Sequence, residues 1–149
     1  MDTLISILHV AGAVFIVGPM AILPMTAMRA VRAGNGSQVA VLAKSTNLFA
    51  WLSLLVFVFG FGAMSMAPEE YELSMTTPWI LWSIILYVIA FALTLFVVVP
   101  SMKKAAAALG EGAAAGADAP KASYPAIAAG SGISSLLLLA VVVLMVWKP

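Results

Sequence analysis

Long stretches without a charged residue constrain this sequence more than any other feature. The charged residues fall into clusters, and the uncharged stretches between them cover residues 3–28, 45–68, 73–102 and 122–147. Each stretch is longer than the roughly 20 apolar residues that cross the hydrocarbon core of a bilayer as an α-helix. Their apolar runs do not alternate in polarity as the strands of a transmembrane barrel would. The pattern therefore predicts four transmembrane helices.

Composition supports the same conclusion. Hydrophobic residues make up 64% of the chain and charged residues 9%, whereas soluble domains carry about 25% charged residues. A net charge of +1 provides no basic face for nucleic acid. The chain has no cysteine, which excludes disulfides and cysteine-ligated metals. We predict an all-α integral membrane four-helix bundle that forms a single transmembrane domain over residues 1–149.

The distribution of Lys and Arg predicts the orientation of this bundle. Six of the seven basic residues lie in the predicted loops 29–44 and 103–122, whereas all charged residues of loop 67–76 are acidic. Because cytoplasmic loops are enriched in Lys and Arg, we place the two basic loops in the cytoplasm and loop 67–76 outside, with both termini. The spans then cover residues 4–28, 45–66, 77–102 and 123–147 of a multi-pass protein of the bacterial plasma membrane.

The N-terminal segment does not match a cleavable signal peptide. It begins with Asp2 instead of a basic region, and its apolar run is longer than that of a signal sequence. We therefore expect it to remain as the first helix.

His9 is the only histidine and the only ionisable residue well inside a predicted span. Such residues are functional candidates by default, and a neutral imidazole can bind haem iron or copper or carry a proton. The outer side of the membrane, where His9 lies, also holds Met64, Met66 and Met75 in this topology. Their thioethers favour Cu(I). The alternatives are a neutral His9 bonded to a backbone carbonyl or water, and methionines that fill packing gaps. We expect no metal or cofactor, and leave bound lipid open.

The first span is also interrupted by Gly18, Pro19 and Pro24. Each proline removes a backbone hydrogen bond and kinks the helix, which leaves carbonyls for neighbouring hydroxyls or water. The kink either frames a cavity for a cofactor or lipid, or serves ordinary packing.

Small residues indicate where helices approach closely. Ala126, Gly130 and Ser134 recur every four residues and form one small face of the last span, which allows close packing in lipid. By depth, this face could receive the first helix near Gly18. The other small packing candidates are Gly12 in the first span, and Gly60 and Gly62, which we assign to a separate contact. Such faces serve either packing within the bundle or contact with another protein.

The outer loop carries Glu69, Glu70 and Glu72. These carboxylates either are simply solvated, or dock a basic partner surface or bind a hard cation. Catalytic patterns such as Ser–His–Asp, H-E-x-x-H or a glycine-rich phosphate loop are missing from the sequence, so we do not expect an enzyme. We also recognise neither internal repeats nor charges deep in the spans, as a transporter would show.

The segment from Leu8 to Gly18, LHVAGAVFIVG, resembles a pattern in uncharacterised bacterial integral membrane proteins related to the copper-resistance D type. In these four-helix families a His is followed by a Gly three residues later and a second Gly six residues beyond. The whole chain also resembles an accessory (association-factor) subunit of the actinobacterial respiratory supercomplex, which joins cytochrome bcc to its oxidase. This second resemblance rests on size, four spans, the lack of redox ligands and Ala/Gly/Val-rich composition.

The supercomplex resemblance implies a non-catalytic accessory or assembly subunit. Its partners would be membrane lipid and other integral membrane subunits, in particular the cytochrome bcc–oxidase complex, with no nucleic acid. The alternative function is a metal- or haem-handling membrane protein that uses His9 with the outer methionines.

Overall fold

The computed structural model describes residues 2–115 and 124–149, and within these ranges every regular element is a helix. The first long helix consists of α1 (Asp2–Gly12), the π-helical turn η1 (Ala13–Val17) and α2 (Gly18–Arg32), and the second is α3 (Gly36–Ser65). The third consists of α4 (Pro78–Leu93), the π-helical turn η3 (Thr94–Val98) and α5 (Val99–Ala115). The fourth is α6 (Tyr124–Trp147), and a short 3₁₀ turn, η2 (Glu69–Tyr71), precedes α4.

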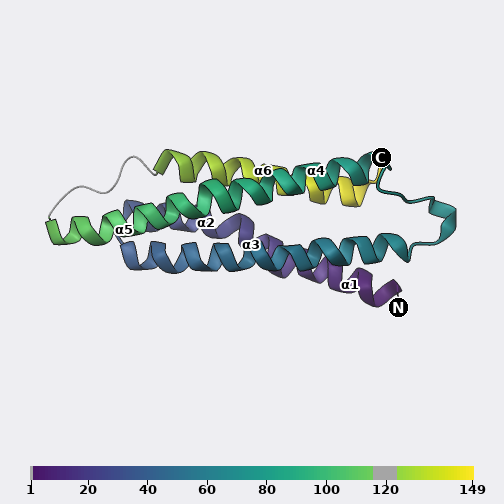
Figure 1. Cartoon of the computed structure of the whole chain (residues 1–149), viewed down its shortest axis with the longest axis horizontal. Coiled ribbons are helices and arrows are strands. Elements are labelled where there is room, and N and C mark those ends of the chain that lie inside the picture. Colours follow the sequence, from purple (N-terminus) through teal and green to yellow (C-terminus); the bar gives the residue numbers. More distant parts are fainter. Residues whose placement is uncertain (1, 116–123) are drawn as a thin grey trace.

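The four long helices lie side by side and alternate in direction, with both termini and the α3–α4 connection at one end (Figure 1). All four are long and apolar enough to cross a membrane. The predicted all-α four-helix bundle is therefore confirmed. We call the end that holds the termini the outer end, following the orientation predicted from the charges.

The helices extend beyond the spans predicted from the charges. The predicted loop 29–44 is mostly helical, because α2 continues to Arg32 and α3 already begins at Gly36. Gly34 adopts a left-handed φ of 72°, its N–H bonds to Val31 O and the N–H of Asn35 bonds to Ala30 O, which is a Schellman ending. The Asn35 side chain then caps α3 by accepting from the Gln38 N–H. Charge spacing marks the apolar part of a helix and not its ends.

Two π-helical turns occur at matching places in the first and third helices. Each ends two residues before a proline, in Phe15-Ile16-Val17-Gly18-Pro19 and in Phe96-Val97-Val98-Val99-Pro100. A proline lacks the N–H of the regular ladder, and a π turn absorbs the resulting mismatch by bonding one residue further along the chain. No internal repeat is recognisable in the sequence, and the correspondence between these two short segments becomes visible only with the two π turns.

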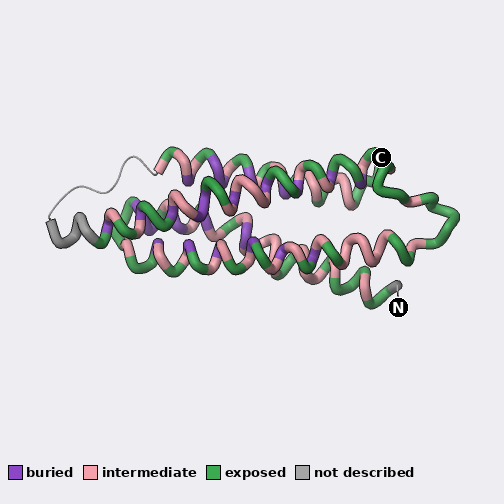
Figure 2. Tube along the Cα trace, in the orientation of Figure 1, coloured by how far each residue is buried: buried purple, intermediate pink, exposed green. Residues whose placement is uncertain are grey.

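The bundle packs differently along its length. Towards the inner end, Met102, Leu109 and Ile127 are the largest side chains of a buried cluster to which the first helix contributes Ala27, Ala30 and Val31. A second cluster lies nearer the middle around Met20, Tyr87 and Leu138. At the outer end the helices pair as α1 with α3 and α4 with α6, and buried residues become sparse along α1 (Figure 2).

Candidate functional site

His9 lies in the contact between α1 and α3. Its Nδ1 atom is 2.8 Å from the backbone oxygen of Val56, and the side chain is half-buried. Because a carbonyl oxygen can only accept, Nδ1 carries the hydrogen and donates it. In the neutral ring, Nε2 then keeps its lone pair. His9 is thus hydrogen-bonded to a backbone carbonyl, which is one of the alternatives predicted from the sequence.

Glycines make room for this contact. A Cβ atom added at Gly60 would lie 2.9 Å from Cε1 of His9, and one added at Gly12 would lie 2.7 Å from Cγ2 of Val56. Further towards the outer end, a Cβ atom at Gly62 would lie 3.1 Å from Cγ2 of Ile5. All three glycines therefore belong to the α1–α3 contact, and the imidazole occupies the space that a larger residue at position 60 would fill.

The small face of α6 meets the third helix. A Cβ atom at Gly130 would lie 2.8 Å from Cγ2 of Val98 in η3, and Ser134 is buried. Ala126 is half-buried on the same face. The expectation that this face receives the first helix near Gly18 is wrong, since nothing lies within 4 Å of a Cβ atom built at Gly18. Depth alone does not specify the rotation of a helix about its axis.

Side-chain hydroxyls and His9 link every neighbouring pair of long helices. We call the following contacts the hydrogen-bond ring: His9 Nδ1 to Val56 O at 2.8 Å, Ser53 Oγ to Tyr87 Oη at 2.7 Å, Thr94 Oγ1 to Ser134 Oγ at 3.5 Å, and Ser135 Oγ to Ala21 O at 3.0 Å. In order, they connect the first helix to the second, the second to the third, the third to the fourth and the fourth back to the first. Polar side chains hold helices together in lipid, where hydrophobic attraction between helices is missing.

The Ser135 contact lies beside the proline kink. Pro24 has no N–H to offer the carbonyl one turn earlier, and the Ser135 hydroxyl donates to the adjacent carbonyl of Ala21. The carbonyl that Pro24 leaves without its helical N–H is that of Met20, so Ser135 bonds to the neighbouring carbonyl, and the expected pairing of a hydroxyl with the freed carbonyl stays a prediction. We did not predict a role for Ser53, Tyr87, Thr94 or Ser135 from the sequence. Hydroxyl groups inside long apolar spans were the signal that could have identified them.

The structure spreads the outer candidate ligands over separate segments. Met64 is half-buried one turn beyond Gly60 on α3, whereas Met66 and Met75 lie beyond that helix and are 40% and 54% exposed. Glu69, Glu70 and Glu72 are all exposed around η2. Among the described residues, no group of three or more His, Asp or Glu side chains is arranged to hold a metal ion.

The fold and this site define a small polytopic helical membrane protein whose neighbouring helices are linked by side-chain hydrogen bonds. The chain belongs to the family described as predicted integral membrane protein (DUF2269), whose sequence model matches residues 3–149. This membership agrees with the resemblance to uncharacterised integral membrane proteins and gives the supercomplex resemblance no support. No curated protein and no solved structure matches the chain.

Proposed function

We propose that this protein is a non-catalytic accessory or assembly subunit of a larger membrane complex. The observation that supports the proposal most is the position of the first helix. Only 6% of its most apolar stretch is buried by the rest of the chain, compared with 17%, 33% and 28% for the other three long helices. Yet this helix carries the histidine, the two prolines and a π turn. The outer half of this helix, α1, carries His9 and packs mainly against α3 alone, so it is suited to contact a helix from another protein.

The chemistry of α1 fits such a role. The side of α1 that faces the bundle is occupied by the glycine contacts with α3, whereas Leu4, Ile7 and Val10 are each more than half exposed, as is Val14 in the adjoining η1. Apolar helices in lipid associate through close packing, interhelical hydrogen bonds and lipid release. The partner we expect is therefore another integral membrane subunit. The resemblance in size and composition to a supercomplex accessory subunit makes the cytochrome bcc–oxidase complex the first candidate.

The test is a pull-down of the tagged chain from native membranes solubilised in digitonin, followed by mass spectrometry. Co-purifying membrane subunits are expected, and Val10→Trp with Val14→Trp should displace them by filling the exposed side of the first helix. The matched control is Leu139→Trp with Val143→Trp on α6, whose side chains are similarly exposed. A chain that purifies alone, or partners that both double variants release equally, would contradict the proposal.

The second candidate function is metal or haem handling at His9. A metal-binding histidine commonly donates its other ring N–H to a backbone carbonyl, which fixes the ring and raises its basicity. The Nδ1 contact with Val56 O has this form and leaves Nε2 as the potential ligand. Because His9 is the only histidine in the chain, the second ligand would be a methionine such as Met64 or a residue of another chain.

Metal analysis and a visible spectrum of the purified protein distinguish the two functions. Handling of haem or copper predicts a Soret band or stoichiometric copper that His9→Ala removes. If the purified protein holds neither metal nor chromophore, and the His9→Ala variant still captures the partners, only the accessory function remains.

A further inference from the structure

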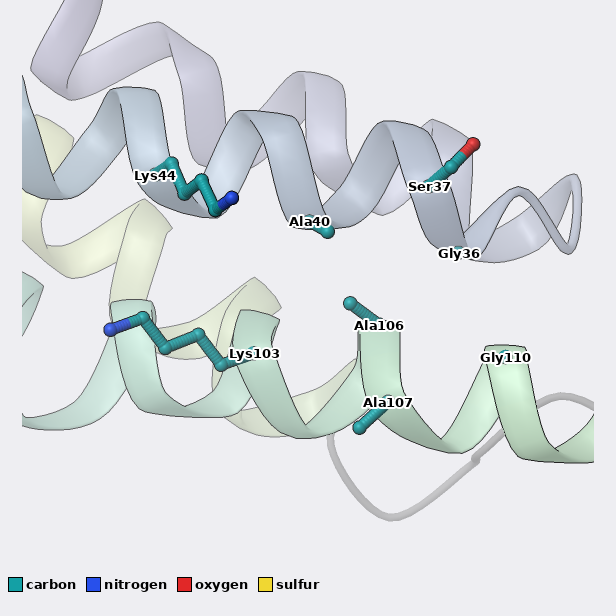
Figure 3. A pocket seen from close by; sticks show the side chains of 8 residues that line it. All are labelled: Gly36, Ser37, Ala40, Lys44, Lys103, Ala106, Ala107 and Gly110. Carbon is teal, nitrogen blue, oxygen red and sulfur yellow. The ribbon is translucent and has the colours of Figure 1, made fainter.

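The inner end of the bundle carries a groove between the start of α3 and the end of the third helix. It encloses about 540 Å³, and its lining residues are Gly36, Ser37, Ala40, Lys44, Lys103, Ala106, Ala107 and Gly110. Lys44 and Lys103 lie on facing helices, with Ala40 and Ala106 directed into the space between the helices (Figure 3). The groove thus combines a narrow apolar floor with two amines.

Small residues create this shape. Gly36 brings α3 against α5 so closely that an added Cβ atom would lie 3.0 Å from both the Ala106 oxygen and the Leu109 Cβ atom. Both lysines are exposed. The Ser37 hydroxyl donates to Asn35 Oδ1 at 2.9 Å and is thereby engaged in the capping of α3. The lysine amines are therefore the polar side-chain groups of the groove that can reach a ligand.

The groove lies at the depth of lipid headgroups. At about 1.5 Å per residue, α3 rises about 32 Å from Lys44 to Ser65, which already matches the roughly 30 Å of a hydrocarbon core. The third helix rises about 38 Å from Pro78 to Lys103 by the same geometry. Residues 36–44 and 103–110 therefore extend past the hydrocarbon into the headgroup layer, and the two lysines lie at the boundary.

The charge of this end is complementary to an anion. The described helices bring five basic residues to this end, namely Arg29, Arg32, Lys44, Lys103 and Lys104, against Glu111, whereas the outer end carries Asp2 and three glutamates against Lys148. Basic pockets between transmembrane helices on the cytoplasmic side are suited to anionic headgroups. A diacyl phospholipid meets both features of the groove, since its phosphate faces the amines while its glycerol and upper acyl carbons cover the alanines.

We propose that this groove binds the headgroup of an anionic phospholipid from the cytoplasmic leaflet, with Lys44 and Lys103 holding the phosphate. The site is distinct from His9 and from the exposed side of α1, so it does not depend on the proposed accessory function.

The experiment is native mass spectrometry of the full chain in detergent, titrated with dioleoyl phosphatidylglycerol or dioleoyl phosphatidylcholine. The first phosphatidylglycerol should bind more tightly than phosphatidylcholine. Lys44→Gln with Lys103→Gln should weaken it roughly 30-fold, because each lysine near an anionic surface contributes about a factor of five. The matched control, Arg29→Gln with Lys104→Gln, removes two exposed charges from the same end outside the groove. It should change the affinity less than about twofold.

A second variant tests the groove without changing any charge. It also provides a separate test in case the Lys44→Gln, Lys103→Gln variant folds poorly. Ala40→Leu retains every charge and enlarges a side chain that is directed into the groove (Figure 3), and it should also weaken phosphatidylglycerol binding severalfold. Equal losses in the lysine and control pairs would overturn the proposal in favour of diffuse surface charge. Equal binding of the two lipids, or displacement of phosphatidylglycerol by millimolar inorganic phosphate, would also overturn it.

Discussion

The two halves of the first helix pack in opposite ways, although α1 is the more apolar of the two. α2 lies against α3, α6 and α5 and buries Met20, Pro24, Ala27 and Ala30, whereas α1 packs mainly on α3 and leaves most of its large side chains exposed. The difference follows from residue size and from the turn that joins the halves. Alanines let three neighbours approach α2, while α1 is attached through glycines and one imidazole. Burial in this membrane protein therefore depends on which residues are small, more than on which are apolar.

The largest effect is expected when a small residue in α2 is enlarged. Ala27 is 0% exposed in the inner cluster, so Ala27→Leu should destabilise the fold by about 1–3 kcal/mol through overpacking. Unfolding in sodium dodecyl sulfate, followed by circular dichroism, measures the loss. The control is Val10→Leu on the exposed side of α1, which should have almost no effect. Comparable losses in both variants would show that α1 is as tightly packed as α2.

A smaller effect is expected where α1 meets α3. In Gly60→Ala the new methyl group would lie 2.9 Å from His9 Cε1, so the ring must shift and its bond to Val56 O weakens. We expect a loss of about 1 kcal/mol in the same unfolding assay. The effect should disappear in a His9→Ala background, which removes the ring. An undiminished loss in that background would mean that another contact, and not His9, fits against Gly60.

The smallest effect is expected at the link between α2 and α6. Ser135→Ala removes the hydroxyl that donates to Ala21 O beside the kink, and interhelical hydrogen bonds in membranes contribute about 0.6 kcal/mol. Ser65→Ala provides the control, since this exposed hydroxyl bonds only within its own helix, to Gly62 O. The prediction is contradicted if Ser135→Ala is no less stable than Ser65→Ala.

The number of helices and their alternation could be predicted from the sequence, because a bilayer imposes a minimum length of uncharged chain on every span. The partners of individual residues could not. His9 was evident as a candidate, but its bond to Val56 O involves a backbone atom that no side-chain pattern marks. Gly130 was recognised as a close-packing residue and assigned to the wrong helix, because a one-dimensional pattern specifies depth and not rotation.

The π turn at η1 preserves the angular phase between the two halves of the first helix. An α-helix advances by about 100° per residue, and a π turn holds an additional residue within the same turn. Removing one residue between Ala13 and Val17 would therefore restore a regular helix and leave α1 in nearly the same angular position relative to α2. His9 would still face Val56. The turn thus marks a place where the chain length can change by one residue while both halves of the helix keep their packing.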